Sequence, residues 1–280
     1  MSLTGTPRGA RTRAALTLAI AATALTPAAA SAAAGDLDPS FGTGGKKVLA
    51  GTELPLDVYV QPDGKIVEVG GQNVSVTGFL VRRVNTDGSP DKSFDGNGAA
   101  TAKFPNLTGS INAVGSALQA DGSIVVAGST SAGVAVARFR PDGSLDPTFG
   151  EGGADGDGRT VIANLPFGFN VVDLVLQPGN KIALVGSYGN DADFIVVRLR
   201  SDGSEDATTF DPADFNGAQD FATTAAGAPD GTVTVVGNTD GSPGSLVGAV
   251  ARYKSDGKST SRSAEPASSR CHRSSSRQRQ

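Results

Sequence analysis

The stretch QPDGKIV at residues 61–67 decides the fold, because it returns three more times along the chain. The copies are QADGSIV at 119–125, QPGNKIA at 177–183 and APDGTVT at 228–234. In three copies an Asp-Gly pair stands between two apolar runs, which is the strongest short-range signal for a β-hairpin. A turn signal that recurs every 51 to 58 residues indicates a repeat protein.

Two further signals repeat in the same order. The first is an arginine four residues before an Asp-Gly pair, at Arg83, Arg138, Arg198 and Arg252. The second is a linker with an aspartate and then a phenylalanine, LDPSFG at 37–42, PDKSFD at 90–95 and LDPTFG at 145–150, with a looser copy at 205–210. Its members are Asp38, Asp91, Asp146 and Asp206 with Phe41, Phe94, Phe149 and Phe210.

Each unit is predicted to form about four short antiparallel strands. Two strands flank the first turn, a third ends at the arginine, and a weaker one follows the phenylalanine, as at 46–49 and 159–162. No stretch after the N-terminal segment has helical periodicity, so we expect almost no helix. The fourth unit departs from the pattern at 210–221, and Ala-Ala-Gly at 225–227 replaces a good strand sequence.

The fold class is therefore all-β, and a β-propeller or partial propeller of about four four-stranded blades fits best. A β-solenoid is the alternative, but its coils usually repeat on a shorter period. The predicted units are 36–88, 89–143, 144–203 and 204–257, within a domain spanning 35–257.

The segments 37–45, 61–67 and 137–150 together resemble the delta-60 repeat. The resemblance covers residues 36 to 257, the whole body of the chain. It implies a bacterial, secreted β-propeller domain of unknown function. The resemblance brings no catalytic residues.

The two ends of the chain differ in composition from the body. Residues 1–34 combine three arginines, an uncharged apolar run and small residues at 28–32, which is the pattern of a signal peptide cleaved after Ala32 or Ala34. We therefore expect a secreted or extracytoplasmic protein with no membrane span after signal removal. Residues 258–280 hold 8 Ser and 5 Arg, which predicts a disordered tail, either a basic arm or the product of a lost or truncated reading frame.

Charge and residue types restrict the function. The body from 35 to 257 carries 15 Lys and Arg against 27 Asp and Glu, which argues against nucleic acid as a partner. The only Cys and the only His are Cys271 and His272 in the tail. The body therefore lacks the residues for Ser-His-Asp or Cys-His catalysis and for a His or Cys zinc site.

The repeated charges and aromatics have two interpretations each. The arginines and aspartates could form a ring of ligand-binding charges, but recurrence in every unit favours ion pairs that hold the framework together. The phenylalanines could be stacking platforms for sugars, but large aromatic side chains mostly serve the core, so we expect them to fill the gap between neighbouring blades.

Two segments resemble fragments of a calcium loop. They contain Asp95 and Asn97 in DGNG at 95–98, and Asp155 and Asp157 in DGDG at 155–158. Neither has the remaining ligands of an EF-hand, so a glycine-rich turn is the favoured interpretation and no cofactor is expected, with calcium as the alternative.

The function that follows is a secreted, non-enzymatic scaffold that binds a protein or a glycan through propeller loops. Two alternatives stay open. One is a carbohydrate-active enzyme that uses paired Asp or Glu at the propeller mouth, and the other is a calcium-stabilised, adhesin-like module.

Overall fold

The structure is a computed structural model that describes residues 35–49, 53–72, 78–108, 111–150, 157–163, 165, 169–189, 192–206, 211–215, 217–242 and 245–256. The predicted signal peptide and tail, as well as Asp155 and Phe210, lie outside these residues. Within them are fourteen strands and one short 3-10 helix, η1 at Pro178–Asn180, which confirms the expected near-absence of helix. None of these described elements is a helix long and apolar enough to span a membrane.

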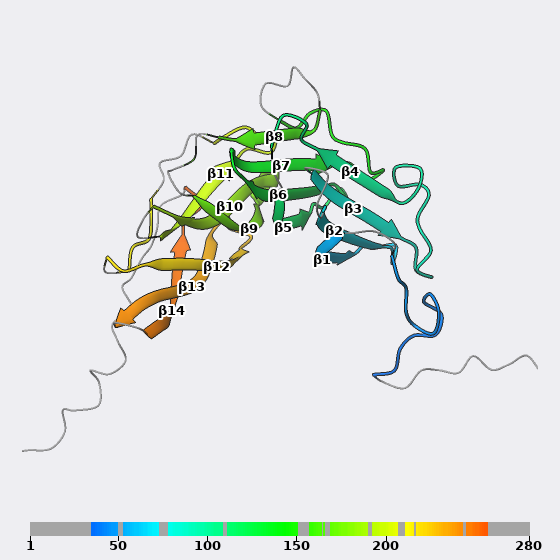
Figure 1. Ribbon diagram of the computed structural model, residues 1–280, viewed down its shortest axis with the longest axis horizontal. Coiled ribbons are helices and arrows are strands. Elements are labelled where there is room, and N and C mark those ends of the chain that lie inside the picture. The colour runs from blue at the N-terminus through cyan, green and yellow to red at the C-terminus, as the bar shows by residue number, and fades with distance from the viewer. Residues whose placement is uncertain are drawn as a thin grey trace, which may run out of the picture.

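The strands form four antiparallel sheets, here named blades 1 to 4 (Figure 1). Blade 1 contains β1 (Glu53–Val60), β2 (Ile66–Gln72), β3 (Gly78–Val84) and β4 (Ala99–Lys103). Blade 2 contains β5 (Asn112–Leu118), β6 (Ile124–Thr130), β7 (Gly133–Phe139) and β8 (Arg159–Ile162). Blade 3 contains β9 (Asn170–Gln177), β10 (Lys181–Tyr188) and β11 (Asp193–Leu199), and blade 4 contains β12 (Asp220–Gly227), β13 (Val233–Ser242) and β14 (Ser245–Tyr253).

The repeated Asp-Gly turns close the first hairpin of each blade. In blade 1 the N–H of Gln61 donates to the carbonyl of Lys65, and the N–H of Gly64 donates back to the carbonyl of Gln61. Gly64 has φ +81°, a left-handed conformation that glycine adopts without steric cost. The third copy lacks Asp-Gly, and η1 makes the turn there with Gly179 at φ +76°.

Two expectations about strands differ from the structure, one for residues 46–49 and one for residues 225–227. Residues 46–49 form only an isolated bridge from Lys46 to Gly42 rather than a strand, because among the described residues no sheet edge lies beside them to pair with. The segment 225–227, expected to be degraded, is the end of β12, because backbone pairing with β13 does not require β-branched side chains. Among the described residues, blades 3 and 4 have three strands each rather than four, and in blade 3 an isolated bridge between Phe194 and Ala213 stands in place of the fourth strand.

The sheets are offset from the sequence units. Blades 1 and 2 each begin in one predicted unit and end in the next, because β4 and β8 follow the phenylalanine linker yet pair back to β3 and β7. In blades 1 and 2 each linker therefore joins the third strand to the fourth strand of the same blade, before the chain enters the next blade.

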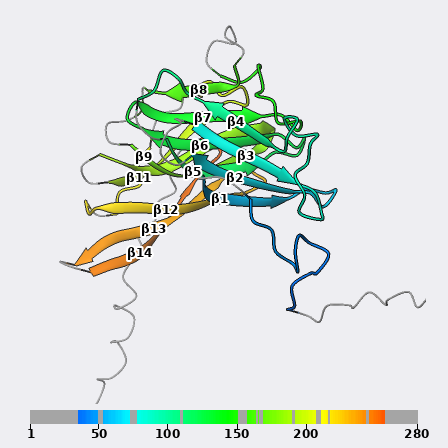
Figure 2. The ribbon, with the colours of Figure 1, turned by 45° about the vertical axis from the view of Figure 1, so that its right-hand side comes forward.

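The blades stand face to face around an arch, and the core lies between them (Figures 1 and 2). Blade 1 contributes Val67, Val69 and Phe79 to a cluster with Ile124 and Val126 of blade 2. Equivalent clusters join blade 2 to blade 3 and blade 3 to blade 4. No blade buries its apolar faces alone, so each one depends on its neighbours.

The two ends of the arch differ. The outward face of blade 4 exposes Phe221, Val236 and Val250. Their counterparts in blade 3, such as Val185 and Val196, are buried against blade 4. At the other end, the outward face of blade 1 also exposes Val58 and Val60, but it carries in addition the ion pair of Arg82 with Glu68, at 3.5 Å.

Candidate functional site

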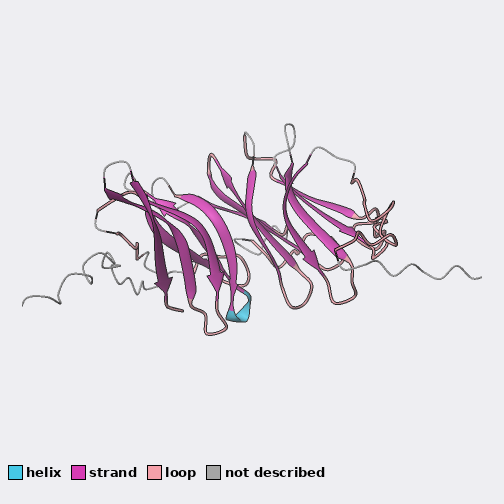
Figure 3. Cartoon of the chain, turned by 90° about the horizontal axis from the view of Figure 1, so that it is seen from below, coloured by secondary structure: helices cyan, strands magenta, loops and turns pink. Residues whose placement is uncertain are grey.

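Each blade has two edges with different chemistry. The turns between the first and second strands and after the third strand lie at one edge, here named the turn edge. The connections between the second and third strands lie at the opposite, loop edge, because successive strands are antiparallel. Figure 3 shows the strands of the blades running between these two edges. All the repeated motifs fall on the turn edge.

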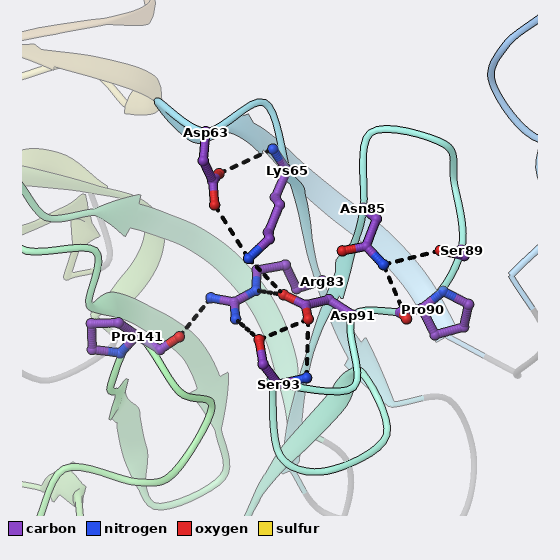
Figure 4. Close-up of polar contacts among 9 residues, drawn as sticks. All are labelled: Asp63, Lys65, Arg83, Asn85, Ser89, Pro90, Asp91, Ser93 and Pro141. Carbon is purple, nitrogen blue, oxygen red and sulfur yellow. Dashed lines mark hydrogen bonds and ion pairs between the residues drawn. The ribbon is translucent and has the colours of Figure 1, made fainter.

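Arg83 joins blade 1 to blade 2 at the turn edge (Figure 4). Its Nε donates to Oδ2 of Asp91 at 2.7 Å, and its Nη2 donates to Oγ of Ser93 at 3.0 Å. Its Nη1 reaches the next blade and donates to the carbonyl of Pro141 at 2.6 Å. The side chains of Arg83 and Asp91 are both only 8% exposed, so the pair is buried.

Arg138 repeats this arrangement between blades 2 and 3. It donates to Asp146 at 2.7 Å, to Thr148 at 3.1 Å and to the carbonyl of Ser201 at 2.5 Å. The guanidinium carbons of Arg83 and Arg138 each lie 4.8 Å from the ring centroid of a linker phenylalanine, Phe94 and Phe149 respectively.

The third and fourth copies change partners. Arg198 bonds to Gln177 at 2.9 Å and to the carbonyl of Lys254 in blade 4 at 2.5 Å. Asp206 pairs with Lys181 at 3.0 Å instead. Arg252 is exposed at the end of the arch and contacts Thr234 at 3.3 Å. Asp38, in the segment before blade 1, accepts hydrogen bonds from Ser40.

The linker phenylalanines lie against the glycine of an Asp-Gly turn. A Cβ on Gly143 would be 3.0 Å from the ring of Phe94, and one on Gly203 would be 2.7 Å from the ring of Phe149. Phe41 occupies the same position against Gly88 of blade 1. Backbone hydrogen bonds reinforce all three contacts, since the N–H groups of Gly42, Asp95 and Gly150 donate to the carbonyls of Asp87, Asp142 and Asp202 respectively. We name this arginine, aspartate and phenylalanine assembly the inter-blade latch.

The latch should make stability fall at low pH. Burial tends to raise the pKa of Asp91, but hydrogen bonds from Ser93, Lys65 and Arg83 outweigh it and hold that pKa well below its usual range. A carboxyl with a lowered folded pKa stabilises the fold above its unfolded pKa of about 4, and this contribution is lost as pH falls through the folded value. We expect the free energy of unfolding to fall below about pH 4, and less steeply in Asp91→Asn. Urea unfolding from pH 2 to 7 measures both, and equal slopes would contradict the expectation.

The predicted calcium-loop residues serve as turn caps. Asp157 pairs with Arg159 at 2.7 Å, and Asn97 accepts a hydrogen bond from the N–H of Ala99 at 2.8 Å. Asp95 holds a left-handed turn position at φ +46°. Asp155, the fourth of these residues, lies outside the described residues. A set of three acidic residues that sequence reasoning missed, Asp193, Asp214 and Asp220, does converge.

A polar cluster joins the first strands of neighbouring blades. Ser116 on β5 donates to Asp57 on β1 at 2.6 Å and lies 2.8 Å from the hydroxyl of Tyr59. Burial raises the pKa of Tyr59 to about 12, so the phenol stays protonated. Likewise, Asp173 on β9 accepts hydrogen bonds from Thr224 and from the N–H of Ala225 on β12. These acids and their partners lie on different strands, so no spacing along the chain could predict their contacts.

A groove of about 300 Å³ lies at the outer rim between blades 1 and 2. Its lining includes Phe104, Leu107, Asp157 and Arg159. Arg159 is held there by Asp157 and by the carbonyl of Lys103, and it lies 5.9 Å from the ring centroid of Phe104. The groove therefore combines an apolar wall with one fixed cation.

Four face-to-face sheets and an inter-blade latch define a β-propeller repeat protein. Residues 61–94, 119–149, 177–208 and 228–258 match the family model described as "Domain of unknown function (DUF5122) beta-propeller". The four repeats belong to that family, which bears out the resemblance seen in the sequence. No curated protein matches the chain.

Solved structures with similar folds have low sequence identity to this chain. They include a virginiamycin B lyase from Staphylococcus aureus, with 10% identity over 76% of this chain and 71% of the other, and a TM-score of 0.40. An alpha-L-arabinofuranosidase from Clostridium thermocellum has 10% identity over 71% of this chain and 68% of the other, with a TM-score of 0.43. An aldose sugar dehydrogenase from Streptomyces coelicolor has 13% identity over 76% of this chain and 69% of the other, with a TM-score of 0.44. At these values the similarities carry no argument about activity.

Proposed function

We propose that this protein is an exported, non-catalytic scaffold that binds a glycan or a protein at the loop edge of its propeller. The division between the two edges carries the proposal. The turn edge holds the repeated charges, and the latch uses them to join blades. The loop edge is left for sequence that differs from blade to blade.

Connection lengths support this division. The turns at 61–65, 119–123 and 228–232 all have the same length. The loop-edge connections between the second and third strands vary from two residues in blade 2 to five in blade 1. Variable loops on a rigid framework are where binding residues usually lie.

The acids of the first strands support binding over hydrolysis. A glycosidase needs two carboxyl groups that face a shared space about 5–10 Å across. Asp57 and Asp173 are instead engaged with groups of the neighbouring blades, where they act as acceptors. The net negative charge of the body favours neutral or cationic ligands.

Affinity electrophoresis of the full chain in gels containing arabinan, xylan or dextran tests the glycan proposal. We expect retardation by at least one polysaccharide, with no release of reducing ends. Tyr188 closes β10 at the loop edge and is partly exposed, so it can stack on a sugar ring. We expect Tyr188→Ala to weaken retardation about tenfold, since stacking of this kind is worth roughly 1 kcal/mol or more.

Lys92→Ala is the control, because Lys92 is exposed at the turn edge. Equal loss in both variants would place binding elsewhere than the loop edge. Release of reducing ends that Asp57→Asn abolishes would favour the carbohydrate-active alternative. Retardation by none of the three polysaccharides would count against a neutral glycan.

A further inference from the structure

Three aspartates meet at the junction of blades 3 and 4. Asp193 begins β11, Asp220 begins β12, and Asp214 lies on the short segment between the two blades. The bridge of Phe194 with Ala213 places Asp214 directly across from Asp193. One carboxylate oxygen of each residue lies within 4.8 Å of the corresponding oxygens of the other two.

Asp220 is the decisive member of this set. Its side chain is fully buried, at 0% exposure. Its Oδ2 accepts a hydrogen bond from the N–H of Phe215 at 2.8 Å. Its Oδ1 is buried with no hydrogen bond of good geometry among the described residues, and the Thr239 hydroxyl, which interacts with the same carboxyl, is buried in the same condition. Burying a carboxylate oxygen without a well-placed partner is unfavourable, so its position calls for a ligand.

The equivalent positions of blades 1 and 2 show how unusual the set is. Counting from the latch arginine, the position of Asp193 is Gly78 in blade 1 and Gly133 in blade 2. By strand register, Asp214 corresponds to Lys103 and Ala163.

The position of Asp220 is apolar in blades 2 and 3, whereas blade 1 has Glu53 there. The register of the first two strands gives Ile111 and Phe169 as its counterparts, and both pack in the core. In this junction, all three positions carry carboxylates. Carboxylates directly opposite each other in a sheet repel.

We propose that Asp193, Asp214 and Asp220 bind a divalent cation, with Ca²⁺ as the best fit. Ca²⁺ coordinates oxygen atoms at 2.3–2.6 Å, so oxygens bound to one ion lie up to about 5 Å apart. The three oxygens lie within 4.8 Å of one another, which fits this range, and Ca²⁺ accepts such an irregular carboxylate set more readily than Mg²⁺, which demands near-ideal octahedral geometry. The three ligands are all carboxylates, which Ca²⁺ prefers and which suit zinc less well than His or Cys.

The electrostatics of the set agree with this geometry. Burial raises the pKa of Asp220, and the charges of Asp214 and Asp240 act in the same direction, against the opposing effects of Thr239 and the Phe215 N–H. In the part of the chain that the structure describes, no Lys or Arg forms an ion pair with Asp214 or Asp220. A cation at this point would neutralise the repulsion.

The expected role of the ion is to fasten blade 4. The described part of blade 3 has three strands, and the Ala213–Phe215 segment takes the place of a fourth through one bridge and the edge-to-face contact of Phe215 with Phe194, at 5.2 Å between centroids. An ion held by β11, by this segment and by β12 would join all three. This role does not depend on which ligand the loop edge binds.

Calcium titration of the chelator-treated full chain tests the site, with isothermal calorimetry for binding and thermal unfolding for stability. We expect one Ca²⁺ per chain, a higher melting temperature in Ca²⁺, and weaker binding of Mg²⁺. Asp214→Asn is the main variant, because Asp214 is exposed and its replacement should leave the fold intact. We expect this variant to bind Ca²⁺ at least tenfold more weakly.

The sign of the stability change separates a cation site from a structural cluster. In chelator, Asp214→Asn should melt at or above the wild-type temperature, because it removes repulsion. In Ca²⁺ it should melt below the wild type. Asp121→Asn, in a turn of blade 2, is the matched control and should not alter calcium binding. A wild-type chain that takes up no Ca²⁺ at millimolar concentration, or an Asp214→Asn chain that binds it as well as the wild type, would overturn the proposal.

Discussion

Replacing Arg83 with alanine is expected to lower the free energy of unfolding by about 3–5 kcal/mol. The substitution leaves Asp91 buried without its charged partner, and it removes the bond to the Pro141 carbonyl in blade 2. It also removes the guanidinium that stacks on Phe94. Breaking one side of a buried ion pair is costly because the remaining charge is no longer compensated. Urea unfolding followed by far-ultraviolet circular dichroism measures the change.

Arg252→Ala provides the matched control. Arg252 occupies the same position in its unit, but it is exposed, and no other blade within the described residues contacts it as blade 2 contacts Arg83. Its loss should change stability by less than about 1 kcal/mol. Similar losses at Arg83 and Arg252 would show that the contact between blades does not set the energy of the latch.

Replacing Gly203 with alanine is expected to destabilise the chain by about 3 kcal/mol. Gly203 has φ +85°, and an L-residue there costs roughly 1–2 kcal/mol. The added Cβ would also lie 2.7–2.9 Å from three ring atoms of Phe149, which is buried and has no room to withdraw. Overpacking of this kind typically costs a further 1–3 kcal/mol or so.

Gly179→Ala separates these two contributions. Gly179 has a similar φ of +76°, but a Cβ there would meet nothing within 4 Å. This variant should lose only the backbone part, about 1–2 kcal/mol. The difference between the two variants measures the contact between Phe149 and the neighbouring blade, and equal losses would mean that this contact contributes little.

The latch could be predicted in part from the sequence. Recurrence of the arginine and the aspartate favoured a framework role, and the structure pairs them in blades 1 and 2. The reach of Arg83 to Pro141 in the next blade could not be predicted, since it depends on how two sheets stack. In blade 3 the partner of Arg198 is Gln177 rather than the linker aspartate. The sequence does not predict this change either, because Gln177 belongs to the first turn motif and Arg198 to the second.

The sequence by itself determined the strands and turns, because hairpin chemistry is local: an Asp-Gly pair between apolar runs forms a turn whatever surrounds it. It also determined that the body lacks the residues for His- or Cys-based chemistry. Only the tertiary structure decided which side chains meet between blades. Asp193, Asp214 and Asp220 are 6 to 27 residues apart in an apparently irregular stretch, and they converge because β11 and β12 belong to neighbouring sheets that begin at the same edge. Contacts between sheets depend on stacking and register, which no local pattern encodes.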